Sequence, residues 1–90
     1  MKIYIAGQIT GDAGYWEKFE QASNSLAELG HIVLNPAALP KGLTPGDYMR
    51  ICFAMLDSAD KVLFLPGYCE SSGAILEYNY CSYIGKAFCL

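Results

Sequence analysis

One carboxylate in the last quarter of the sequence lies where an apolar side chain is expected. Glu77 belongs to the segment GYCESSGAILEYNY, residues 67–80, which has the pattern of a buried helix from about Ser72 onward. At about 100° per residue, Asn79 and Ser82 fall on the side of that helix that should face water, and Glu77 falls roughly opposite, near Cys81. A carboxylate on the core-facing side lowers stability unless it is paired or hydrogen-bonded. We therefore expect Glu77 to point inward, toward a pocket.

The residues alone leave two interpretations of Glu77 open. In the first, it is a structural side chain that accepts a hydrogen bond from a buried tyrosine hydroxyl or from loop amides, since structural networks also hold buried acids. In the second, it is a catalytic carboxylate that attacks or activates a small ligand.

The residues just before Glu77 could bind an anionic part of such a ligand. Ser71, Ser72 and Gly73 lie at the predicted helix start, where free backbone amides can hold a phosphate or a carboxylate. The alternative is that a serine there is an ordinary N-cap. Glu70 precedes them and is a second acidic candidate.

The first strand and its loop supply the other candidate binding residues. Tyr4 lies midway along the strand, and we expect it to pack in the core with its hydroxyl reaching the pocket; Gly7 and Gln8 begin the loop. The glycines there lack the G-x-G-x-x-G spacing, and no P-loop Lys-Ser/Thr pair is present, which argues against a dinucleotide or Walker-type site.

These candidates must be positioned by elements that the sequence marks clearly. Helical spacing begins at Asp12 and ends at Gly30, and Thr44-Pro45-Gly46-Asp47 has the form of a capping-box helix start. Short apolar runs bounded by Gly, Pro or Asn predict strands. The expected elements are a strand at 2–6, a helix up to 29, a strand at 31–34, a helix at 45–58, a strand at 61–65, a helix at 72–84 and a strand at 86–90.

This order, βαβαβαβ, predicts an α/β fold with one domain over residues 1–90. Because the strands are apolar on both faces, we expect a four-stranded parallel sheet covered by helices on each side, a small doubly wound three-layer sandwich of strand order 2-1-3-4. Ligands bind such sheets where the winding reverses, beyond the carboxyl ends of strands 1 and 3. The loops there are residues 7–11 and 66–73, which carry the candidates above.

Composition limits the function classes. The chain is 53% hydrophobic and 17% charged, which is typical of a core-forming domain rather than a disordered one. A formal net charge of −3 without a basic patch argues against binding to nucleic acid polymers. There is no signal-peptide pattern and no membrane-length apolar run, so we expect a cytoplasmic protein that does not insert into membranes.

The four cysteines do not form a recognisable site. No two have the C-x-x-C spacing and there is one histidine, so we expect free buried thiols, with no metal site and no cofactor. A small parallel sheet with an exposed edge and a tyrosine-rich last helix favours at least a homodimer.

Longer stretches carry a resemblance to known proteins. MKIYIAGQITG, NPAALP, DYMRICFAMLDSADKVLFLPG and SSGAILEYNYCSYIGKAF resemble a small bacterial and phage domain family without an established function, over nearly the whole chain. That family is in turn similar to the nucleoside 2-deoxyribosyltransferases and nucleotide N-glycosidases. The matching positions are Tyr4, Gly7, Ala59-Asp60 and Gly73 with Glu77.

The resemblance implies a nucleoside or nucleotide as the ligand and Glu77 as the nucleophile that attacks C1′ of the sugar. Two acids of those enzymes have no counterpart here: Ser71 stands in place of one, with Glu70 beside it, and the segment Arg50–Cys52 in place of the other. Gln8 replaces the proline common in the small family. The serines favour the nucleotide N-glycosidase branch, because hydroxyls and free amides can hold a 5′-phosphate.

Three functions follow as hypotheses. An enzyme acting on an N-glycosidic bond requires a proton donor, such as Glu70 or a tyrosine hydroxyl, near the bound base. A nucleotide-binding module would use Glu77 to hold ribose hydroxyls without turnover. A structural or assembly protein would have a vestigial pocket filled by side chains.

Overall fold

A computed structural model describes all 90 residues, as three α-helices, four β-strands and two short 3-10 helices. The expected order βαβαβαβ is confirmed. The elements in chain order are β1 (Lys2–Ala6), α1 (Tyr15–Glu28), β2 (Ile32–Leu34), η1 (Pro36–Ala38), α2 (Pro45–Ser58), β3 (Lys61–Phe64), η2 (Tyr68–Glu70), α3 (Ser72–Ile84) and β4 (Phe88–Cys89).

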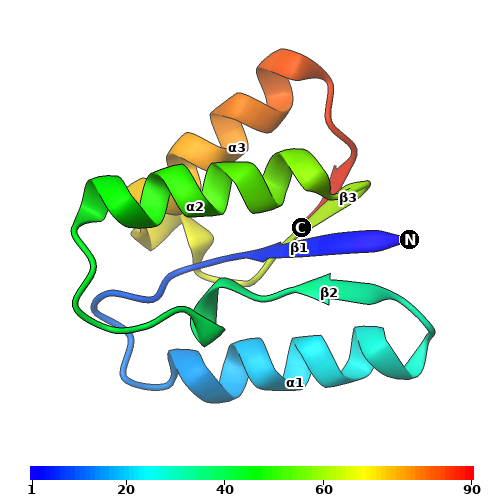
Figure 1. Ribbon diagram of the computed structural model, residues 1–90, viewed down its shortest axis with the longest axis horizontal. Coiled ribbons are helices and arrows are strands. Elements are labelled where there is room, and N and C mark those ends of the chain that lie inside the picture. Colours follow the sequence, from blue (N-terminus) through cyan, green and yellow to red (C-terminus); the bar gives the residue numbers. More distant parts are fainter.

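The four strands form one parallel sheet of order β2-β1-β3-β4, as predicted. Tyr4 in the central strand β1 is paired with Leu34 of β2 and with Val62 of β3. Because all strands run the same way, the loops that follow β1, β2 and β3 lie together at one end of the sheet, on the left in Figure 1. That end is where a doubly wound sheet binds ligands.

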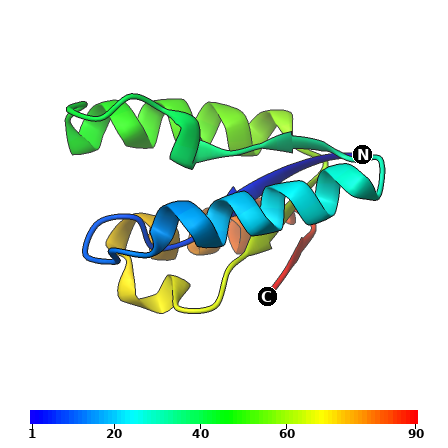
Figure 2. The same cartoon turned by 90° about the horizontal axis from the view of Figure 1, so that it is seen from below.

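Helices cover the two faces of the sheet unequally. Figure 1 shows α2 and α3 on one face and α1 alone on the other, and Figure 2 shows the same layers from below. Two buried clusters correspond to these faces. The first joins Tyr4 and Phe64 of the sheet to Leu56 of α2 and Cys81 of α3, and the second joins Ile5 to Phe19 of α1. Tyr4 therefore points toward α2 and α3.

Local signals in the sequence fix several helix ends. Thr44 and Asp47 form the expected capping box, since the Thr44 hydroxyl accepts from the Asp47 amide and the Asp47 carboxylate accepts from the Thr44 amide. Gly30 follows α1 with a φ of +88°, and the amide of the next residue, His31, donates to the Leu26 carbonyl in the manner of a Schellman motif. None of the three α-helices is long and apolar enough to cross a bilayer.

The last strand is shorter than the sequence predicted. It covers Phe88–Cys89 rather than 86–90. The cause is at Lys86, whose amide donates to the Cys81 carbonyl and whose ammonium donates to the Ala59 carbonyl at 2.6 Å. Lys86 thus belongs to the turn that ends α3 and cannot join the sheet.

Three further details differ from what the sequence indicated. The loops after β2 and β3 each contain a short 3-10 helix, η1 and η2, which the sequence did not indicate. Of the four free cysteines, Cys52 and Cys81 are buried as expected, whereas Cys69 and Cys89 are exposed. Helical spacing would also place Ile84 on the same side of α3 as Glu77, but Ile84 is the last residue of the helix and is 46% exposed.

Candidate active site

A cavity of about 720 Å³ opens at the carboxyl end of the sheet. Its wall includes residues from the loops after β1, β2 and β3, from the N-terminal half of α2 and from the first turns of α3. This volume is in the range of cavities that bind small molecules. The cavity is where the strand order predicted a site, and side chains do not fill it.

Glu77 and Tyr4 meet at the floor of this cavity. Glu77 is on the second turn of α3 and is only 5% exposed, the one charged residue among the buried side chains. The Tyr4 hydroxyl, reaching up from β1, donates to Glu77 Oε2 at 2.5 Å. The hydrogen bond compensates in part for the burial of the carboxylate. The inward direction of Glu77 was expected from the sequence, and a buried tyrosine hydroxyl was one of the two kinds of partner considered for a structural Glu77.

The second oxygen of Glu77 is turned to the cavity. Only Oε2 accepts a hydrogen bond within the protein, yet no enclosed side-chain nitrogen or oxygen lacks a partner. Oε1 must therefore retain contact with solvent, and the contact is through the cavity, because Glu77 lines it. A carboxylate with one oxygen held from below and the other open to a pocket has the arrangement that a nucleophile requires.

Burial also changes the acid–base behaviour of this pair. Removal from water raises the pKa of Glu77 from 4.5 to about 7, and the hydrogen bond from Tyr4 opposes that rise. Burial, and next the nearby Glu77 charge, raise the pKa of Tyr4 far above its ordinary value, so its hydroxyl stays protonated and remains a donor. Glu77 thus changes charge near neutral pH, as functional carboxylates often do.

Cys52 of α2 completes the floor of the cavity. Its thiol lies beside Tyr4 and Glu77, and burial raises the pKa of that thiol, so the protonated form is favoured. The protonated thiol adds an apolar surface beside the dyad.

The start of α3 offers backbone donors rather than side-chain donors. The Ser71 hydroxyl accepts from the Ala74 amide at 3.2 Å, which is the ordinary N-cap role. The amides of Ser72 and Gly73 donate no backbone hydrogen bond, and both residues line the cavity. A Cβ at position 73 would lie 3.3 Å from the Met49 sulfur, so glycine allows α3 to approach α2 closely there. The two free amides can receive an anion.

The structure brings most of the predicted site residues together. The cavity wall includes seven of the eight, namely Tyr4, Gly7, Glu70, Ser71, Ser72, Gly73 and Glu77. Gly7 is also required by packing, because a Cβ there would approach Leu65 and the Phe19 ring at 3.2 and 3.3 Å.

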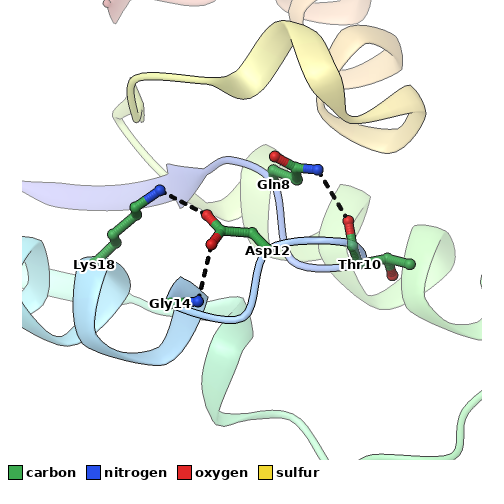
Figure 3. A network of polar contacts seen from close by, with 5 residues as sticks. All are labelled: Gln8, Thr10, Asp12, Gly14 and Lys18. Atoms are coloured by element: carbon green, nitrogen blue, oxygen red, sulfur yellow. Dashed lines mark hydrogen bonds and ion pairs between the residues drawn. The ribbon is translucent and has the colours of Figure 1, made fainter.

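Gln8 is the exception among the predicted site residues. It does not line the cavity, and its side-chain amide donates to the Thr10 carbonyl at 3.2 Å (Figure 3). In the same loop, Asp12 accepts from the Gly14 amide and pairs with Lys18 at 2.7 Å. These contacts fix the shape of the loop after β1, so Gln8 supports the wall from outside.

Sequence reasoning missed the contribution of the loop after β2. This loop and the start of α2 place Leu39, Lys41, Tyr48 and Met49 on the wall. The signal was available: the carboxyl end of β2 shares the sheet edge with β1 and β3, so the segment PAALPKGLTP had to lie beside the predicted switch point.

Together, the fold and the site define a small doubly wound α/β domain with a buried carboxylate facing a pocket at the carboxyl end of its sheet. The chain belongs to the family described as "Domain of unknown function (DUF4406)", whose model matches residues 1–89. Comparison with curated proteins gives no match.

Proposed function

We propose that the protein binds a nucleoside or nucleotide in the 720 Å³ cavity and cleaves or transfers at its N-glycosidic bond, with Glu77 as the nucleophile. The observation that carries the proposal is the open Oε1 of a carboxylate whose Oε2 is held by Tyr4. The resemblance to nucleoside 2-deoxyribosyltransferases and nucleotide N-glycosidases at Tyr4, Gly7, Gly73 and Glu77 supports the same choice.

The chemistry would proceed in two displacements. Glu77 Oε1 attacks the anomeric C1′, the bond from C1′ to the base nitrogen breaks, and the base leaves with a proton. The product is a glycosyl ester of Glu77. Water, or the nitrogen of a second base, then attacks C1′ from the opposite side and releases the carboxylate. Two inversions return the original configuration at C1′.

Other groups on the wall would have supporting roles. Tyr4 keeps Glu77 oriented and stabilises its charge. Glu70 is the only other carboxyl group on the cavity wall and is the candidate donor for the leaving base. The free amides of Ser72 and Gly73 would receive a 5′-phosphate. Because only the ionised form of Glu77 attacks, base release should rise with pH through about 7.

The test is a base-release assay. Nucleosides, deoxynucleosides and their 5′-monophosphates would be incubated with the protein and free base followed by chromatography. We expect release that is lost in Glu77→Gln, which keeps size and neutralises the charge, and kept in Glu20→Gln, an exposed residue on α1. Release by Glu77→Gln at the wild-type rate would exclude Glu77 as the nucleophile.

A non-catalytic nucleotide-binding module is the second candidate, favoured by one observation. Apart from the hydroxyl of Tyr4, no side chain hydrogen-bonds to Glu77, and Glu70 is exposed, so no acid–base partner is fixed beside the carboxylate. In this case ligands would raise the unfolding temperature without any base release. Glu77→Gln would also bind nearly as well as wild type, because an amide can still accept from a ribose hydroxyl.

A further inference from the structure

A second hollow, of about 420 Å³, adjoins the cavity on the side of β2. Its wall is built from the start of α1 and the residue Ala13 before it, from η1 and from the residues after η1, namely Ala13, Tyr15, Trp16, Ala37, Ala38, Leu39 and Lys41. Tyr15, Ala37, Leu39 and Lys41 also line the first cavity. The two hollows therefore lie side by side along a shared wall.

Most of the residues that line the second hollow are hydrophobic, and one is a cation. Trp16 contributes an indole ring that is 51% exposed, a surface on which a flat aromatic group can stack. Lys41 is the only basic side chain on the wall of either hollow, and it takes part in neither of the two ion pairs of the molecule. Both carboxylates, Glu70 and Glu77, line the first cavity alone. An anion is thus favoured at the shared wall and an aromatic ring beyond it.

The segment that carries Lys41 is held in place at both ends. The Asn35 side chain accepts from the Ala37 amide at 3.0 Å and caps η1. The Tyr48 hydroxyl of α2 donates to the Pro40 carbonyl, next to Lys41, at 2.6 Å. These bonds hold the wall between the two hollows against α2. The second hollow is therefore part of the folded domain and does not belong to a flexible loop.

We propose that the second hollow is a subsite for a second nucleobase, and that the ligand class is two nucleosides joined through phosphate. This inference rests on the proposed function, because it places the sugar that is attacked at Glu77. The base of the other nucleoside stacks on Trp16, and the linking phosphate lies at Lys41. A pyrophosphate linker would offer one phosphate to Lys41 and one to the free amides of α3.

This assignment revises the expectation drawn from the glycine pattern. The absent G-x-G-x-x-G sequence excludes one mode of dinucleotide binding, in which phosphates approach a glycine-rich turn after the first strand. The second hollow offers a different mode of dinucleotide binding, in which the contacts come from the loop after β2 and from the first turn of α1.

The chain supplies its own reporter for the test. Trp16 is the only tryptophan, so tryptophan emission reports on the second hollow alone. Titrations would compare adenosine 5′-monophosphate with two linked forms at matched absorbance, namely 5′-5′ pyrophosphate-linked dinucleotides such as NAD⁺ and diadenosine diphosphate, and 3′-5′-linked dideoxyadenosine monophosphate. We expect a linked form to change the Trp16 emission and to bind about tenfold more tightly than the mononucleotide, as stacking of one base implies. The preferred linkage then identifies the substrate.

Variants separate this inference from the proposed function. Calorimetry would measure the affinities of the variants. In Trp16→Ala and in Lys41→Gln, the affinity for the linked ligand should fall to within about threefold of the affinity for the mononucleotide. Tyr83→Ala and Lys2→Gln change exposed residues outside both hollows and should leave the affinity for the linked ligand unchanged. Quenching with tight binding but no base release would support the subsite and refute the catalysis. Equal affinities for linked and single nucleotides, with unchanged Trp16 emission, would overturn the subsite even where bases are released.

Discussion

Replacing Glu77 with glutamine should stabilise the protein above neutral pH. The side chain keeps its size and can still accept a hydrogen bond from Tyr4, but it no longer brings a charge into the interior. The wild-type carboxyl group has its pKa raised from 4.5 to about 7 by burial. At about 1.4 kcal/mol per pKa unit, this rise corresponds to about 3 kcal/mol of lost stability when the group is ionised.

The sign of the pH dependence follows from which state holds the proton more tightly. Between about pH 4.5 and 7 the folded protein is protonated at Glu77 while the unfolded chain is not, so the free energy of unfolding falls as pH rises through this window. Below this pH window the carboxyl group is neutral in both the folded and the unfolded state. Above the window it is ionised in both states, and the full loss of stability is present. Glutamine lacks this dependence. The two proteins should therefore be similar at about pH 4 and differ by about 3 kcal/mol at about pH 8.

Urea unfolding followed by circular dichroism, at several pH values from about 4 to 8, measures this difference directly. For a domain of this size, about 3 kcal/mol corresponds to roughly 10–20 °C in the unfolding temperature. The m-value should be unchanged, since the surface exposed on unfolding is the same. Glu20→Gln changes an exposed position, so its free energy of unfolding should vary with pH as that of the wild type does. The conclusion that desolvation of Glu77 sets its pKa would be refuted if the stability of Glu77→Gln changed with pH as the wild type does, or if Glu77→Gln were less stable than the wild type at pH 8.

The remaining predictions concern the partner of Glu77, one helix cap and the thiols. Tyr4→Phe removes the hydrogen bond that lowers the pKa of Glu77, so the rise of the base-release rate with pH should shift to higher pH. A pH profile of base release that does not shift would contradict the role assigned to Tyr4. Thr44→Ala breaks the capping box of α2 and should reduce the free energy of unfolding by about 1 kcal/mol, measured in urea; no loss would show that the cap is dispensable. A thiol reagent should modify Cys69 and Cys89 in the native protein and leave the fully buried Cys81 unmodified, whereas all four cysteines should react in denaturant, counted by mass spectrometry.

The architecture followed from the sequence because the first three strands are short apolar runs closed by Gly, Asn or Pro, and because right-handed crossovers leave few orders for four parallel strands. The inward direction of Glu77 followed from helical spacing alone. The details that sequence reasoning missed depend on contacts between distant segments. One such contact is made by Lys86: its amide closes the turn that ends α3, and its ammonium reaches the carbonyl of Ala59, 27 residues away.

The same reason explains the part of the site that was not predicted. Helical or strand periodicity identifies faces of regular elements, whereas Lys41 and Trp16 come together only when η1 packs against the first turn of α1. A 3-10 helix of three residues has too few positions to show a period. Gln8 was placed in the site by its position after β1, but its bond to Thr10 depends on the conformation of the loop.

The Tyr4–Glu77 hydrogen bond joins residues 73 positions apart in the sequence. It forms only when β1 is in the sheet and α3 has docked on it, after the loops between them have closed. Pairings of such long sequence separation are slow to form in parallel sheets. The dyad is thus a marker of complete folding: a collapsed chain with native helices but an undocked α3 would have normal secondary structure and no paired carboxylate. Recovery of the dyad during refolding should lag behind recovery of helix content.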